Sequence, residues 1–176
     1  MEEERITAER FWNAWHKFPE WMKQYWPKSD TDITRAGEWT KGVIYPFVVT
    51  IVAPQLNCQL SLEENKTDFL FRRDGRVMVH MEHEDNIEGV YSPKKELDKL
   101  KSTGAPLKCL ISYAPESEVQ MHFDRMYTIT TNSIQQRPET QWLFIIGVFR
   151  GRDNIMQNED WIARKANAGG LENLLW

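Results

Sequence analysis

The stretch KTDFLFRRDGRVMVHMEHE, residues 66–84, decides the fold. Its two halves, 66–72 and 76–84, are largely apolar segments that flank Arg73-Asp74-Gly75, and a glycine-containing turn between such segments predicts a β-hairpin. Polar residues gather in HMEHED, residues 80–85, at the end of the second strand. The hairpin therefore predicts the start of a sheet and marks the place to look for a chemical site.

Two hairpin registers are open, and the alternation of side chains separates them. A two-residue Asp-Gly turn would pair Arg73 with Arg76 and mix phenylalanines with carboxylates on one face. A three-residue loop pairs Arg72 with Arg76 and leaves one face wholly apolar. That apolar face would consist of Phe69, Phe71, Val77, Val79 and Met81. We therefore expect the three-residue loop.

Three carboxylates meet in the expected register. Asp68 lies opposite His80, and Asp68, Glu82 and Glu84 converge at one end of the polar face. Carboxylates held this close repel one another unless a cation or a proton offsets their charge. Because oxygen-rich sites suit Mg²⁺ or Mn²⁺, we expect these three residues to bind a metal. A zinc or iron site that includes His80, and acids that are simply solvated, are the alternatives.

The segments around the hairpin predict alternating helices and strands. A Trp-rich helix is expected over 7–26, with Thr7 as its N-cap and Pro19 kinking it or starting a second helix. Residues 38–56 suit a strand by their β-branched content and a buried helix by their length, and we favour a helix that ends near Pro54. Strands are also expected at 57–63, 107–114 and 141–150, and helices at 92–104, at 118–134 and in the tail 158–176.

Length and composition fit one compact domain. The chain has 176 residues, of which 41% are hydrophobic, so we expect a single domain over 1–176 with its core at about 38–150. The order of elements indicates an α/β fold with a mixed central sheet flanked by helices. The sequence lacks an apolar run of membrane-spanning length, and its start MEEER is acidic. We therefore expect a soluble, cytoplasmic protein in which Cys58 and Cys109 are reduced thiols.

Charge and motifs narrow the classes of function. The 22 Lys+Arg and 26 Asp+Glu residues give a net charge of −4, which argues against binding nucleic acid by bulk electrostatics alone. The net charge does not exclude an enzyme that binds a phosphate group through a bound metal ion. The sequence has no G-x-S-x-G motif and no glycine-rich phosphate-binding loop, so serine hydrolases, nucleotide-dependent ATPases and dehydrogenases are disfavoured.

The hairpin and its neighbours resemble the PD-(D/E)XK nuclease superfamily, whose motif is an Asp followed further along the chain by (Asp/Glu)-x-Lys. Here Asp68 matches the Asp and Glu82 matches the acidic position. Glu84 stands where the family has its lysine, which resembles the E-x-E of some restriction enzymes, and Thr67 stands where proline is common. The resemblance covers residues 38–114, and it allows a weak match of Glu38 to an acid on the preceding helix.

The resemblance implies a restriction endonuclease-like fold and Mg²⁺- or Mn²⁺-dependent hydrolysis of a phosphodiester in DNA. Asp68 and Glu82 would bind the metal, and Glu84 would complete the site or position the attacking water. Lys94 is the candidate for a relocated lysine and Glu96 for an extra carboxylate, because both border the expected inward face of the helix that follows. Lys95 and Lys99 are expected to point further outward.

A catalytically inactive relative that serves as an interaction or assembly protein is the alternative function. The Trp-rich helix and Trp176 would then form a homodimer surface, whereas in the simpler interpretation they pack on the chain's own sheet. Arg72, Arg73 and Arg76 are expected at the hairpin tip, where they would touch a phosphate backbone or remain exposed turn residues.

Overall fold

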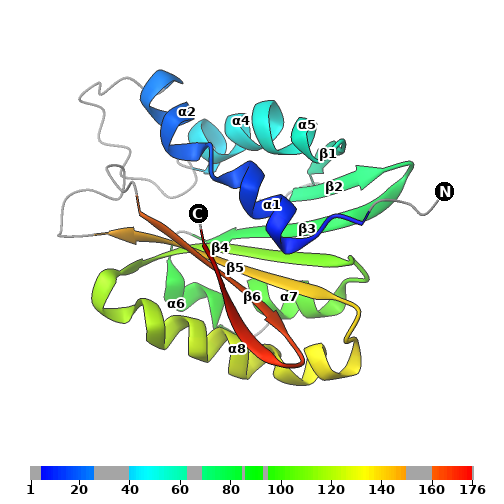
Figure 1. Cartoon of the computed structure of the whole chain (residues 1–176), viewed down its shortest axis with the longest axis vertical. Helices are drawn as coiled ribbons and strands as arrows, with labels where there is room; N and C mark the ends of the chain where they lie inside the picture. The colour runs from blue at the N-terminus through cyan, green and yellow to red at the C-terminus, as the bar shows by residue number, and fades with distance from the viewer. Residues whose placement is uncertain are drawn as a thin grey trace.

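The computed structural model describes residues 5–25, 40–62, 69–84, 86–92, 95–149 and 160–175. These residues form a seven-stranded sheet with the strand order β1-β2-β3-β4-β5-β6-β7. Figure 1 shows the sheet as the middle layer, with α1, α2, α4 and α5 on one face and α6, α7 and α8 on the other. The α/β fold with a mixed sheet flanked by helices is therefore confirmed.

The bounds of the elements follow the sequence pattern closely in the middle of the chain. The strands are β1 Gln59–Leu62, β2 Phe69–Arg73, β3 Arg76–Glu84, β4 Leu107–Pro115, β5 Gln141–Phe149, β6 Trp161–Asn167 and β7 Gly170–Leu174. The principal helices are α1 Ala8–Trp15, α2 Phe18–Tyr25, α6 Ile87–Val90, α7 Glu96–Ser102 and α8 Val119–Gln136. A further helical segment is built from η1 Thr40–Ile44, α4 Tyr45–Phe47, η2 Val48–Val52 and α5 Ala53–Gln55.

The pairing of the strands is antiparallel at both edges and parallel in the centre. β1, β2 and β3 are antiparallel, β3, β4 and β5 are parallel, and β5, β6 and β7 are antiparallel again. The connections β3–α7–β4 and β4–α8–β5 advance along the sheet in one direction, so right-handed crossovers bring both helices to the same face. Two hydrophobic clusters, one on each face, result from this arrangement.

The β2–β3 turn differs from the expected three-residue loop. Arg73 pairs with Arg76, so Asp74 and Gly75 alone form the turn, with φ of 49° and 78°. Positive φ at both central residues defines a tight hairpin turn whose twist matches that of the strands. The register then shifts at Met78, so Phe69 pairs with Met81 and Phe71 with Val79, each two residues further along β3 than expected. His80 pairs with Leu70 and not, as expected, with Asp68. The bulge reconciles the shorter turn with the apolar face.

The N-terminal layer packs on the chain's own sheet. Thr7 caps α1 by accepting a hydrogen bond from the Arg10 backbone N–H at 3.2 Å, and Pro19 lies in the first turn of the separate helix α2. Trp15 is fully buried and meets Trp161 of β6 edge-to-face at 5.4 Å between ring centroids. Trp12, Trp15 and Trp21 of these two helices thus belong to the core, whereas Tyr25 is exposed. Trp26 and Trp176, named for a homodimer surface, lie outside the described residues.

The ambiguous segment 38–56 is helical over its described part. Residues 40–55 form one continuous helical run that includes the wide turns η1 and η2. Pro46 and Pro54 lack a backbone N–H, so the regular i→i−4 ladder is interrupted at both positions. The favoured helix ending near Pro54 is therefore confirmed.

Two expected elements are wrong. The tail is not helical, because β6 and β7 form an antiparallel hairpin there. Trp161, Ala163 and Ala166 of β6 are buried against the rest of the fold. Ser92 does not open α7, whose N-cap is Lys95; a short helix, α6, capped by Asn86, comes first. None of the helices in the described ranges is long and apolar enough to cross a membrane.

Candidate active site

Glu82 is a carboxylate at the centre of the fold. It lies on β3, between β2 and β4, and is 0% exposed. Burying a charged carboxylate is costly unless hydrogen bonds and opposite charges compensate it. The partners of Glu82 therefore define the candidate site.

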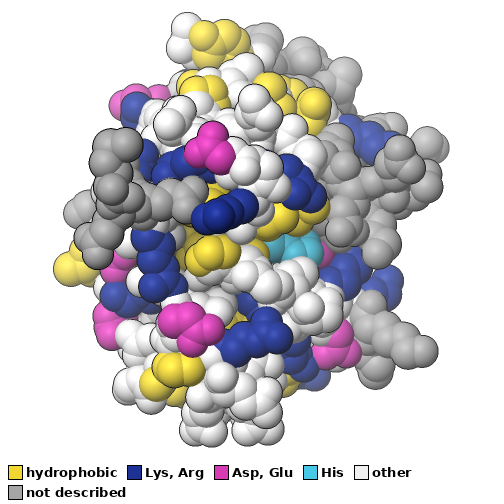
Figure 2. All heavy atoms as spheres, turned by 90° about the vertical axis from the view of Figure 1, so that its right-hand side faces the viewer, with side chains coloured by type: hydrophobic (Ala, Val, Ile, Leu, Met, Phe, Trp, Pro, Cys, Tyr) yellow, Lys and Arg dark blue, Asp and Glu magenta, His cyan; other side chains and the backbone are white. Residues whose placement is uncertain are grey.

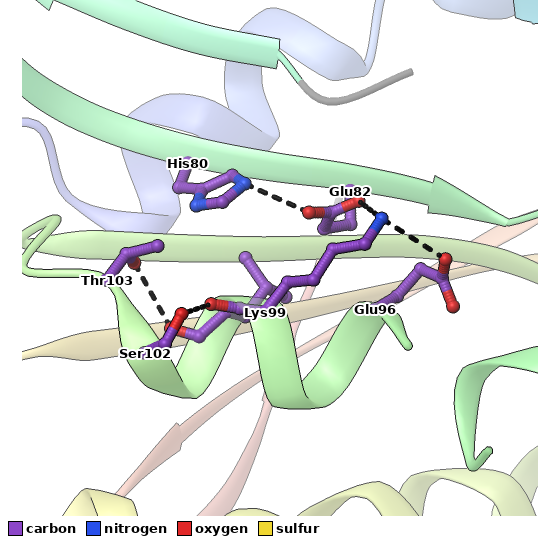
Figure 3. Close-up of polar contacts among 7 residues, drawn as sticks. His80, Glu82, Glu96, Lys99, Ser102 and Thr103 are labelled. Carbon is purple, nitrogen blue, oxygen red and sulfur yellow. Dashed lines mark hydrogen bonds and ion pairs between the residues drawn. The ribbon is translucent and has the colours of Figure 1, made fainter. Parts of the chain in front are cut away.

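His80 and Lys99 contact this carboxylate, and Glu96 contacts the same lysine (Figure 3). His80 Nε2 donates to Glu82 Oε1 at 3.0 Å, and Lys99 Nζ lies 3.3 Å from Glu82 Oε2. The same ammonium lies 3.4 Å from Glu96 Oε1. Lys99 thus holds one positive charge between two carboxylates. We call these four residues, His80, Glu82, Glu96 and Lys99, the β3–α7 centre.

Local structure explains why these side chains meet. His80 and Glu82 are two residues apart on a strand, so both point to the face that α7 covers. Glu96 and Lys99 are three residues apart on α7 and therefore lie on one side of the helix. Hydrogen bonds from Ser102 Oγ to the Lys99 carbonyl and from Thr103 Oγ1 to the Leu100 carbonyl close the end of α7.

Glu96 has an oxygen that the structure leaves without a partner. Its side chain is 9% exposed, and Oε2 finds no hydrogen-bond partner among the described residues. Two carboxylates directed at one cation form a hard-oxygen donor set, which suits Mg²⁺ or Mn²⁺ better than zinc. Within the described ranges, however, no three His, Cys, Asp or Glu side chains are placed to hold a metal. These ranges therefore supply two carboxylates, the donor type that Mg²⁺ and Mn²⁺ prefer, with a lysine between them.

The other predicted ligands have different outcomes. Glu84 lies at the end of β3, where its carboxylate accepts a hydrogen bond from the Asn86 backbone N–H at 3.0 Å and packs on Gly89 of α6. Asp68, Lys94 and Glu38 lie outside the described residues. Phe69, which follows Asp68 in the chain, pairs with Met81, which precedes Glu82.

The second histidine of this strand, His83, lies on the opposite face, as expected. Its Nδ1 is 3.0 Å from Thr40 Oγ1 and its Nε2 is 3.0 Å from the Tyr113 hydroxyl. Burial lowers the pKa of His83 to about 3, so the ring is neutral at physiological pH. This histidine belongs to the packing between β3, β4 and the N-terminal layer and not to the β3–α7 centre.

A second buried lysine lies beside the centre. Lys108 of β4 pairs with His80 across the strands and is 1% exposed. Its Nζ donates to the Lys101 carbonyl at 3.3 Å and lies 4.9 Å from the centre of the Trp142 ring. Burial, and to a smaller extent the charge of Arg137, lowers the pKa of Lys108 to about 8.

Basic side chains also surround the turn end of the sheet. Figure 2 looks at this end and shows lysine and arginine side chains spread over it, with fewer acidic ones among them. Arg72 Nη1 donates to the Gly75 carbonyl at 3.3 Å, and Arg73 Nη2 donates to the Leu56 carbonyl at 2.6 Å. These contacts hold two of the three hairpin arginines close to the β2–β3 turn.

Lys99 belongs to the β3–α7 centre, although its position in the sequence pattern predicts that it points outward. The helix phase was set by Leu97 and Leu100, both of which are buried as expected. Lys99 was expected to point outward, but the long lysine stem passes along the helix and brings its ammonium back to β3. The signal in the sequence that could have located Lys99 is Glu96, three residues earlier on the same helix, because its carboxylate pairs with the Lys99 ammonium.

Comparison with known proteins adds no identification. No family model, no curated protein and no solved structure matches this chain.

Proposed function

We propose that this chain is a restriction endonuclease-like, Mg²⁺- or Mn²⁺-dependent phosphodiester hydrolase that acts on DNA. The observation that carries the proposal is the buried Glu82 carboxylate on the interior strand β3, held between His80 and the Lys99 ammonium. The order of elements supports it as well. A helix, three antiparallel strands that include the acidic β2–β3 hairpin, further helices and a parallel strand follow one another as the resemblance implies.

The residues would divide the work as follows. Glu82 and Glu96 would hold the metal, with Asp68 as the third carboxylate that the sequence motif supplies. A bound divalent ion lowers the pKa of a water molecule and offsets charge on the phosphate. His80 fixes the orientation of the Glu82 carboxylate through its hydrogen bond of 3.0 Å. Lys99, in place of Lys94, would steady the phosphate or the attacking water.

Glu84 has a less direct part in this proposal. Its carboxylate is held at the end of β3 by the Asn86 backbone N–H, so it would complete the site or position water from that side. The hairpin arginines, Arg72 and Arg73, would contact the phosphate backbone. A net charge of −4 argues that DNA binding depends on the metal and weakens strongly with salt.

One observation favours the alternative, a catalytically inactive relative with a binding role. The Lys99 ammonium already lies between Glu82 and Glu96, where it compensates their charge without any metal. In an inactive relative, this lysine would be a permanent internal counter-ion of the fold.

Plasmid cleavage tests the proposal. Supercoiled DNA is incubated with the protein and 5–10 mM Mg²⁺ or Mn²⁺, concentrations on the order used to saturate weak carboxylate sites. Wild-type protein should nick the plasmid, and Glu82→Gln should lose at least about 100-fold in rate, the size of losing a metal's charge stabilisation. The matched control is Glu88→Gln, an exposed glutamate of α6, which should cleave like wild type. Absence of metal-dependent cleavage by wild type, or equal cleavage by Glu82→Gln, would overturn the proposal.

A further inference from the structure

The Lys99 ammonium lies between the buried carboxylates of Glu82 and Glu96. It lies 3.3 Å from Glu82 Oε2 and 3.4 Å from Glu96 Oε1, longer than the roughly 2.7–2.9 Å of a strong charge-assisted contact. The ammonium is therefore shared between these carboxylates, and neither contact is as short as a strong ion pair. The geometry is that of two buried carboxylates that share one side-chain cation.

Charge explains why the two cations would compete. Two ionised carboxylates carry two negative charges, of which one ammonium offsets one, whereas a divalent ion offsets both. An ammonium and a divalent ion placed together between the same oxygens would repel each other strongly in a buried site. The ammonium must therefore move away before a divalent ion can take both carboxylates.

Glu96 supplies a second, independent sign that the site takes a cation. Its side chain is more than nine-tenths buried, and Oε2 has no hydrogen-bond partner in the described part of the chain. A buried acceptor without a partner is costly, and a metal ion or its bound water would satisfy it. The Lys99 contact through Oε1 leaves this second oxygen unused.

We propose that Lys99 is a built-in competitor that sets the divalent-cation affinity of the Glu82–Glu96 pair. This inference rests on the proposed function for the kind of metal, but it concerns loading of the site and not cleavage. The positive charge of the residue at position 99, together with the two carboxylates, would then set the metal concentration at which the site is half occupied.

The test is Mn²⁺ binding to the full chain, measured by the loss of the free-ion EPR signal and by the shift in melting temperature. Lys99→Met should lower the Mn²⁺ dissociation constant about tenfold or more, equivalent to about 1.4 kcal/mol. Lys99→Arg keeps the charge and should bind no tighter than wild type. The matched control is Lys101→Met, which removes a lysine of the same helix that pairs with Asp98 at 2.7 Å and should leave Mn²⁺ affinity unchanged.

The variants also separate this inference from the proposed function. If Lys99→Met binds Mn²⁺ more tightly while wild type does not cleave DNA, the competitor role stands and the nuclease proposal fails. If wild type cleaves with metal and Lys99→Met binds Mn²⁺ no tighter than wild type, the competitor role fails alone. Glu96→Gln added to Lys99→Met should abolish the gain, and a retained gain would contradict the site.

Folding of the variant gives a further readout. Lys99→Met leaves two buried carboxylates without their shared cation, so its melting temperature without metal should fall. Mn²⁺ should restore it, and should raise it by more than it raises that of wild type. If the variant does not fold without metal, Mn²⁺ should rescue folding during refolding, and failure of that rescue would overturn the inference.

Discussion

Lys108 should make the stability of this protein rise with pH in the alkaline range. Lys108 is 1% exposed, and within the part of the chain that the structure describes its amine has no carboxylate within ion-pair distance. The folded state lowers its pKa from 10.5 to about 8. Between these two values the unfolded chain binds more protons than the folded chain, so stability rises as pH rises.

The magnitude follows from the same two values. Each pKa unit corresponds to about 1.36 kcal/mol, so protonated Lys108 costs the folded state about 3 kcal/mol below pH 8. Between pH 7.5 and 10 about 2 kcal/mol of that cost disappears. Lys108→Met removes the titration and loses the hydrogen bond to the Lys101 carbonyl and the contact with Trp142, which together contribute about 2 kcal/mol.

Urea unfolding followed by tryptophan fluorescence measures the effect at pH 7.5 and at pH 10. The difference in unfolding free energy, Lys108→Met minus wild type, should fall by about 2 kcal/mol between these two pH values. Ser102→Ala, which removes a non-titrating group at the end of α7, serves as the control and should show a constant difference. A constant difference for Lys108→Met would refute the reasoning that its amine is buried at a cost.

Two further predictions concern the opposite face and the hairpin. Burial lowers the pKa of His83 from 6.5 to about 3, so the unfolded chain gains a proton first on acidification, and about 4 kcal/mol of stability should be lost between pH 7 and 3.5. Acid unfolding of His83→Gln should lack this part of the loss, and identical curves would contradict it. Gly75→Ala should cost about 1 kcal/mol, because φ is +78° and an added Cβ meets nothing within 4 Å, so only the backbone is strained. The control in urea unfolding is Gly104→Ala, where an added Cβ also meets nothing within 4 Å; equal stability of the two variants would contradict the turn geometry.

Period-two alternation made the faces of the central hairpin predictable. It separated His80 and Glu82 from His83, and it placed Phe69 and Phe71 with Val79 and Met81. It did not predict the length of the turn. The turn has two residues, and the irregularity at Met78 restores the same alternation of faces that a three-residue loop would give. A strand pattern fixes which residues share a face, and it leaves the position of a bulge open.

Tertiary contacts decided the parts that local pattern could not. The tail was expected to be helical, but Trp161 and Ala163 find their place against β5 and the N-terminal helices, which favours a strand. Glu96 was correctly placed near the candidate centre. Lys99 was not, because the end of a long side chain can lie far from the face that its Cα occupies.

A crystal structure with Mn²⁺ bound would test the central claim most directly. The account predicts an anomalous peak about 2.0–2.3 Å from an oxygen of Glu82 and an oxygen of Glu96, with the Lys99 ammonium displaced from its position between them. A structure at millimolar Mn²⁺ that shows no peak at these carboxylates, with Lys99 still between Glu82 and Glu96, would contradict it.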